Sequence, residues 1–309
     1  MTENHRVANL VIVGVPKAGT GSLFAYLAQH PDVCGSDEKE TGYFNHYNPW
    51  RHTGPVPPIE QYARHWAHAA GERYALEATP TYSYGGEPVI SALRTVLGRP
   101  RIVLILRDPA DRLWSAYTFQ RSVGNNAGIS SFGHYLDTVE QRLRDGVPMV
   151  PGDGMHGLRI GFYADYLGAW LDEFGEDVRV VFTEDMRRDP GRVVADLCSW
   201  LGIDSGAVAG LDLGARNVTR HPRSPRAASV ARRLKRRTEA LNLLPATAYP
   251  RLREAYFRLN SGRLAERFDP AQRRRVENLY RDSNLTTARL LAAHGYEELP
   301  PWLRVGSAA

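Results

Sequence analysis

The chain has 309 residues, of which 43% are hydrophobic, and a formal net charge of +5. This length suits one large α/β domain with a buried core, and no apolar run reaches the roughly 18 residues that a membrane-spanning helix needs. The two cysteines, Cys34 and Cys198, lie far apart and outside any Cys/His cluster, which argues against a disulfide framework and against structural zinc. The first apolar run begins close to Met1 and leaves no room for a signal peptide, so we expect a cytoplasmic protein.

The first element is an apolar run at Leu10–Val15, followed by a glycine-containing loop and an amphipathic segment that ends at His30. This order predicts a buried strand, a tight turn and a helix that begins near Gly19. Such a junction binds anions, because backbone N–H groups and the positive end of the helix dipole meet there, and Lys17 adds a charge. The loop differs from a Walker A motif, since Thr20 stands where that motif has its lysine. The candidate anion-binding residues are Lys17, Ala18, Gly19, Thr20, Gly21 and Ser22.

The segment after this helix carries the candidate general bases. It is acidic and then aromatic over Asp37–Phe44, and His46 follows shortly after. Glu40 and His46 are the residues of this segment that we consider as bases. An ordinary carboxylate is a weak base toward a hydroxyl, so Glu40 would need help from its surroundings.

The next stretches are candidates for contact with an acceptor molecule. Tyr47–Pro58 is rich in proline and aromatic residues, which predicts an irregular loop, and its Trp50 suits an apolar or sugar face. A strand-like run at Tyr74–Ala78 follows. Polar residues at the end of this run are further candidates, and the glutamate among them is a third possible base. They are Glu77, Thr79 and Tyr82; the first two either contact the acceptor or support residues that do, and Tyr82 either lines the acceptor site or packs in the core.

Another apolar, β-branched run at Arg101–Arg107 predicts a second buried parallel strand. It ends in Arg107, whose guanidinium group suits a phosphate. Asp108 and Pro109 come next, and Ser115 lies on the helix that we expect to follow.

The remaining patterns alternate between strands and helices. We expect a strand at Val178–Thr183 and an irregular rim at Gly146–Gly157. Helical spacing is found at Pro88–Leu97, Tyr163–Phe174, Pro190–Leu201 and Gln272–His294, with Gly295 ending the last of these. Alternation of this kind predicts an α/β fold with a P-loop-like parallel β-sheet flanked by helices, and anionic ligands at the carboxyl ends of its strands.

The C-terminal third is basic. We expect a single domain over residues 1–309, with a basic helical extension at about 216–305. The Arg-rich run from Arg216 to Arg237 fits a solvated face better than a nucleic-acid surface, because the net charge is small and no base-stacking pattern accompanies it. The sequence gives no indication of the oligomeric state.

Three motifs, taken in order, resemble the sulfotransferases that use 3′-phosphoadenosine 5′-phosphosulfate (PAPS). Pro16-Lys17-Ala18-Gly19-Thr20 followed by Leu23 resembles their 5′-phosphosulfate loop. Arg107 and Ser115 match the spacing of the arginine and serine that hold the 3′-phosphate in that family. Gly161-Phe162-Tyr163, at the start of a helix, is also similar to the family.

The resemblance implies PAPS as donor, 3′-phosphoadenosine 5′-phosphate (PAP) as product, and no metal. It adds Tyr163, Arg220 and Arg223 to the nucleotide site, the last two because a late loop of the family closes over the adenosine. Glu40 lies where the heparan sulfate enzymes, the most similar group, have their catalytic glutamate. The cytosolic aryl and steroid enzymes use a histidine instead, which keeps His46 as the alternative.

The acceptor stays open between a carbohydrate and a small metabolite with a hydroxyl or amine. Gly42 replaces a histidine common in the heparan sulfate enzymes, and Ala78 replaces a lysine, so a second lysine near the transferred group is not expected. Two rival hypotheses are a nucleotide-dependent small-molecule kinase, which would need ATP and magnesium, and a non-catalytic nucleotide-binding module.

Overall fold

The computed structural model describes residues 6–51, 54–123, 125–126, 128–149, 154–214, 221–222, 261–262 and 266–304. The chain divides into two compact units. The first comprises Met1–Arg112, Phe162–Asn217 and Tyr280–Ala309, and the second Leu113–Gly161 and Val218–Leu279. The single domain with a basic extension stays a prediction, and the Arg-rich segment lies outside the described residues except for 221–222.

The first unit is built on a five-stranded sheet of order β2-β3-β1-β4-β5, in which every neighbouring pair is parallel. Its strands are β1 (Leu10–Gly14), β2 (Val33–Gly35), β3 (Tyr74–Glu77), β4 (Arg101–Leu106) and β5 (Val178–Phe182). Four of these strands confirm the predictions made from apolar runs in the sequence. Such runs are expected because a parallel strand covered on both faces is hydrophobic along its whole length. The edge strand β2 was missed, since three residues are too short to show a period.

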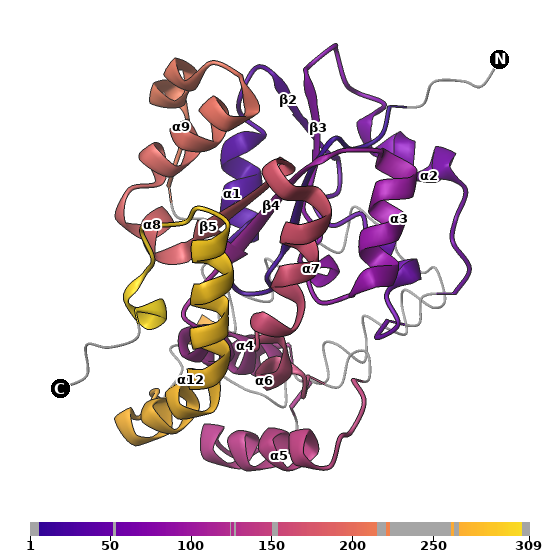
Figure 1. Ribbon diagram of the computed structural model, residues 1–309. Helices are drawn as coiled ribbons and strands as arrows, with labels where there is room; N and C mark the ends of the chain where they lie inside the picture. Colours follow the sequence, from indigo (N-terminus) through magenta and orange to yellow (C-terminus); the bar gives the residue numbers. More distant parts are fainter. Residues whose placement is uncertain are drawn as a thin grey trace. The chain divides into compact units, whose positions relative to one another are not determined.

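Helices cover both faces of this sheet (Figure 1). α1 (Thr20–Leu27) packs beside α9 (Pro190–Leu201), and α3 (Glu87–Leu97) packs beside α7 (Ala164–Phe174). The chain passes from β1 through α1 toward one edge, and from β3 through α3 toward the other edge. Right-handed crossovers therefore place α1 and α3 on opposite faces. The predicted α/β fold class is confirmed.

Short helical elements complete the first unit. They are α2 (Ile59–Ala63), α8 (Thr183–Arg188) and the 3₁₀ turns at Tyr43–Tyr47, Arg64–Trp66, Pro80–Tyr82, Gly175–Asp177, Ser205–Gly210 and Pro301–Leu303. Residues 48–51 and 54–58 are irregular, as the proline-rich stretch predicted.

The second unit contains α5 (Phe132–Arg144), α6 (Gly157–Ile160) and a two-stranded antiparallel pair, β6 (His221–Pro222) with β7 (Ser261–Gly262). α4 (Pro109–Ser122) and α12 (Pro270–Ala293) each contribute residues to both units. Aromatic side chains pack against one another inside the second unit. The rings of Trp114 and Phe268 are stacked with their centroids 5.3 Å apart.

In the part of the chain that the structure describes, no helix combines the length and the hydropathy needed to cross a membrane.

Candidate active site

The loop between β1 and α1 lies at the carboxyl ends of the strands, where the sequence predicted an anion site. Two of its residues take left-handed backbone angles, Lys17 with φ 74° and Gly19 with φ 101°. Glycine adopts such an angle without steric cost, and Gly19 caps α1. A helix start leaves backbone N–H groups without intrahelical partners, and these groups attract an anion. The residues from Lys17 to Ser22 thus lie at the start of α1, and their anion-binding role stays a prediction.

Side chains from other strand ends hold this loop in place. The buried hydroxyl Oγ1 of Thr183 donates to the carbonyl of Ala18 at 2.6 Å and lies 3.0 Å from the carbonyl of Leu106. Arg107 donates from Nη1 to the carbonyl of Lys17 at 3.0 Å. The carbonyls of Lys17 and Ala18 thus bind protein donors, and within the loop the N–H groups of Ala18 and Ser22 donate to the carbonyls of Val15 and Gly19. Thr183 was missed as a functional residue, although its position at the end of a strand was a signal.

The charges around the loop favour a bound anion. Burial and the neighbouring Arg107 guanidinium lower the pKa of Lys17 to about 8, and the Glu40 carboxylate acts in the opposite direction. Burial and the Arg187 charge likewise lower the pKa of Arg107. The Nε of Arg107 is buried and has no hydrogen-bond partner among the described residues. An anion would relieve the repulsion between Lys17 and Arg107, and would offer that N–H group an acceptor.

Glu40 is the exposed candidate base. Its Oε1 forms an ion pair with Lys39 Nζ at 2.8 Å, and the same Nζ donates to the carbonyl of Ala78 at 3.0 Å. The sequence indicated that a lysine near the transferred group is missing because residue 78 is alanine. That expectation stays a prediction; in the structure Lys39, from the neighbouring segment, brings its ammonium group to the backbone of residue 78.

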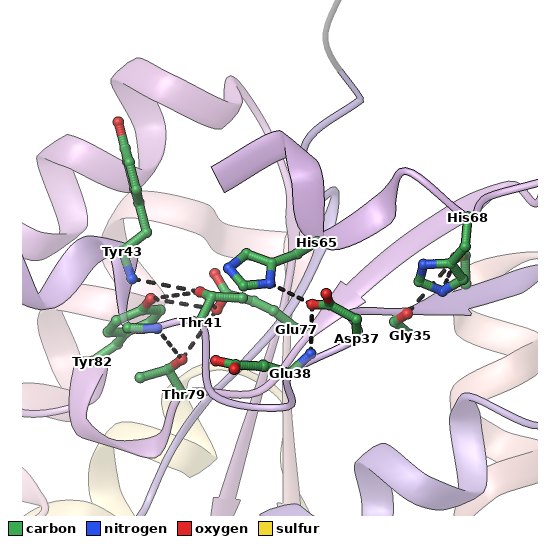
Figure 2. Close-up of polar contacts among 12 residues, drawn as sticks. Gly35, Asp37, Glu38, Thr41, Tyr43, His65, His68, Glu77, Thr79 and Tyr82 are labelled. Atoms are coloured by element: carbon green, nitrogen blue, oxygen red, sulfur yellow. Dashed lines mark hydrogen bonds and ion pairs between the residues drawn. The ribbon is translucent and has the colours of Figure 1, made fainter. Parts of the chain in front are cut away.

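The carboxylate of Glu77, at the end of β3, is fully buried and accepts hydrogen bonds from several hydroxyls (Figure 2). Thr41 donates at 2.6 Å, Tyr62 at 2.7 Å, Thr79 at 3.1 Å and Tyr82 at 3.3 Å. Burial raises the pKa of Glu77, and these hydrogen bonds oppose the rise.

The burial of Glu77, Thr79 and Tyr82 bears on the roles expected for them. Each has 1% or less of its surface exposed. The sequence placed them against an acceptor and made Glu77 a third candidate base. In the structure their polar atoms bind one another and the backbone after Glu40, so we propose a supporting role for all three. Tyr62 and Thr41, which complete the cluster, were not predicted.

The other end of the Glu40 segment is also fixed. The N–H of Asp37 donates to the carbonyl of His65 at 3.1 Å, and the two side chains are hydrogen-bonded (Figure 2). That side-chain bond holds the pKa of Asp37 below its usual value. Because residues on both sides of Glu40 are attached to the rest of the fold, its backbone has a defined position.

The alternative base His46 and the candidate acceptor residue Trp50 belong to the next turn. His46 is half-buried, with Nδ1 3.2 Å from the carbonyl of Gly54. Trp50 is also half-buried, and its backbone N–H donates to the Asn48 side chain at 3.0 Å. Both roles stay predictions.

The nucleotide-binding predictions have different outcomes. Tyr163 is fully buried and donates from its hydroxyl to the carbonyl of Arg107 at 2.7 Å, so it supports the end of β4 from behind. Ser115 is half-buried on α4, in the second unit, whereas Arg107 is in the first. Their pairing on a phosphate stays a prediction. Arg220 and Arg223 lie outside the described residues.

A parallel α/β fold with a glycine-containing loop and a helix start at its strand ends is common among proteins that bind phosphate groups. The chain belongs to the family described as "Sulfotransferase domain", whose model matches residues 8–212. A crystal structure of a sulfotransferase from Alicyclobacillus acidocaldarius is similar with a TM-score of 0.68 and 25% identity, over 97% of this chain and 100% of that one.

Two curated relatives show the same likeness over part of their length. The membrane-associated sulfotransferase kil1 of Dictyostelium discoideum is 33% identical over 114 residues, which are 36% of this chain and 22% of that protein. The bifunctional heparan sulfate N-deacetylase/N-sulfotransferase 1 of Mus musculus is 26% identical over 215 residues, which are 65% of this chain and 22% of that protein. This chain therefore spans about a fifth of the length of these relatives.

Proposed function

We propose that this chain transfers a sulfuryl group from PAPS to a hydroxyl or amine of a carbohydrate or a small metabolite. The observation that carries the proposal is the pair of cations at the β1–α1 loop. Lys17 and Arg107 repel one another, and a buried guanidinium N–H has no partner among the described residues. Two close cations beside a helix start call for an anion with several oxygens.

The residues present fit the donor. Lys17 and the N–H groups of residues 19–21 would hold the 5′-phosphosulfate, and Arg107 would hold a second phosphate, for which Ser115 stays the partner predicted from the sequence. When bound, PAPS supplies the sulfuryl group. Lys17 would then neutralise charge on the leaving phosphate oxygen, in the way that preorganised cations stabilise transition states of phosphoryl transfer.

Glu40 is proposed as the general base. It is the exposed carboxylate whose charge acts on Lys17, so it lies on the side of the loop that an acceptor can approach. It would take the proton of the acceptor hydroxyl or amine as the new bond to sulfur forms. Lys39, whose Nζ forms an ion pair with Glu40, would orient that carboxylate.

Calorimetric titration with PAP in the presence of a magnesium chelator tests the donor site. We expect saturable binding with one site per chain, and weaker binding in the Lys17→Ala variant. ATP with magnesium is the comparison ligand, because the rival kinase hypothesis requires stronger binding of that pair. Absence of PAP binding at millimolar concentration would overturn the proposal.

An acceptor panel with PAPS, read by mass spectrometry for an added sulfate, tests the transfer. Amino sugars belong on the panel because relatives carry the name heparan sulfate N-sulfotransferase. Hydroxylated sugars and small phenols or alcohols complete it. Binding of PAP together with no sulfated product and no cleavage of PAPS would favour the non-catalytic module.

A further inference from the structure

We propose that Glu77 is a positioning residue, whose buried carboxylate orients three hydroxyls and thereby fixes the turn after Glu40. This inference rests on the proposed function for its effect on catalysis, since Glu40 is the proposed base. The geometry itself is independent of which acceptor is used.

The first step is the direction of the hydrogen bonds. Three of the hydroxyls around Glu77 also accept a backbone N–H, and one of them is Thr41 Oγ1, to which the N–H of Tyr43 donates at 3.5 Å. The N–H of Gly42 donates to Thr79 Oγ1 at 3.2 Å, and the N–H of Phe44 donates to the Tyr82 hydroxyl at 3.1 Å. Each hydroxyl has a single proton: Thr79 directs it to the carboxylate, and the Tyr82 hydroxyl lies 3.3 Å from the carboxylate and 3.4 Å from Thr41 Oγ1. Glu77 therefore determines which lone pairs of Thr79 and Tyr82 face the turn.

Thr41 makes the third connection. Its Oγ1 donates to Glu77 at 2.6 Å, and the residue is the immediate neighbour of Glu40. The end of β3 beside Glu77 is attached to the same segment, because the N–H of Ala78 donates to the carbonyl of Lys39 at 3.0 Å. The backbone of residues 39–44 is thus bonded to the end of β3 on both sides of Glu40.

The second step is the charge of Glu77. Four hydroxyl donors face a carboxylate that has about four lone-pair positions. The arrangement matches an ionised carboxylate that is solvated by the protein's own hydroxyls instead of water.

Tyr62 supplies a matched control. Its hydroxyl donates to the other oxygen of Glu77 at 2.7 Å, from α2, and the ring stacks on Tyr43. Unlike Tyr82, it accepts no hydrogen bond from the backbone of residues 42–44 among the described contacts. Tyr62 and Tyr82 are 1% and 0% exposed, so removal of either hydroxyl empties a similarly buried position.

The test compares Tyr82→Phe with Tyr62→Phe and with Glu77→Gln. Amide hydrogen exchange of residues 42 and 44 is the direct readout, and PAP affinity verifies that each variant is folded with an intact loop. We expect faster exchange at both amides in Tyr82→Phe and Glu77→Gln, a smaller change in Tyr62→Phe, and PAP affinity within about twofold of the parent.

Turnover is the second readout, with PAPS and the acceptor of the panel that gives product. We expect Glu77→Gln to lower kcat by about 10- to 100-fold with an unchanged KM for PAPS, because a misplaced base slows the chemical step without weakening donor binding. Tyr82→Phe should lower kcat more than Tyr62→Phe. A purely structural role would lower stability in both tyrosine variants alike and would not separate their kcat values.

The outcomes separate this inference from the proposed function. Equal exchange at residues 42 and 44 in the two tyrosine variants, or parent-like exchange in Glu77→Gln, overturns the positioning role whatever the enzyme does. If Glu77→Gln does not fold, the tyrosine pair decides alone. A parent chain that yields no sulfated product overturns the proposed function, while the exchange experiment still tests the turn.

Discussion

Replacement of Thr183 by valine should loosen the anion loop while the shape of the side chain is kept. The hydroxyl carries one proton, which serves the carbonyls of Ala18 and Leu106 at 2.6 and 3.0 Å, and the residue is 6% exposed. Valine leaves these buried acceptors without that donor. An unsatisfied buried polar group costs about 1–3 kcal/mol, so we expect Thr183→Val to lower the free energy of unfolding by about that amount.

Part of this loss should also appear in ligand affinity. A loop that is no longer clamped must be ordered when PAP binds, and that ordering opposes binding. The free energy of the lost hydrogen bonds, about 1–3 kcal/mol, sets the upper limit of the loss in PAP affinity. About 1.4 kcal/mol corresponds to a tenfold change in a dissociation constant. PAP should therefore bind more weakly to Thr183→Val, by tenfold or somewhat more.

Urea unfolding measures the first effect and calorimetric titration with PAP measures the second. Thr183→Ser is the matched control, since it keeps the hydroxyl and loses a methyl group, and it should retain the PAP affinity of the parent. The reasoning is refuted if Thr183→Val unfolds within about 0.5 kcal/mol of the parent and binds PAP equally well.

Three further predictions concern the charges of the site. Lys17 has a pKa of about 8 in the free protein, and a bound anion would raise it, so the complex holds more protons above pH 8. PAP affinity, measured by calorimetry, should be constant below pH 8 and fall above it, whereas Lys17→Arg should show no such inflection. Glu40→Gln should keep PAP affinity and lower product formation by about 100-fold or more, as judged by mass spectrometry, and the exposed neighbour variant Glu38→Gln should not. Arg107→Lys keeps the charge and loses the guanidinium fork, so PAP should bind about tenfold more weakly in the same titration; unchanged affinity would contradict the role of Arg107.

The strands and the anion loop could be predicted because their signals are local. A buried parallel strand is apolar at every position, and the loop after β1 needs glycine and lysine at adjacent places in the chain. The same holds for Arg107, which follows directly from the last residue of β4. For Glu40 the local acidic and aromatic pattern identified the segment, and the comparisons support the family to which that pattern belongs.

The supports of the site were decided by tertiary structure alone. Thr183 binds a carbonyl 165 residues away in the chain, and Tyr62 reaches Glu77 from a helix whose own pattern is too short to interpret. Glu77 looked from the sequence like a residue for an acceptor or a base, because a carboxylate at a strand end is usually solvated. Only the fold surrounds it with four hydroxyls and turns it inward. The sequence by itself thus determined which chemical groups this protein brings to the sheet edge. Their mutual orientation depended on hydrogen bonds between distant segments, which exist only after the backbone has folded.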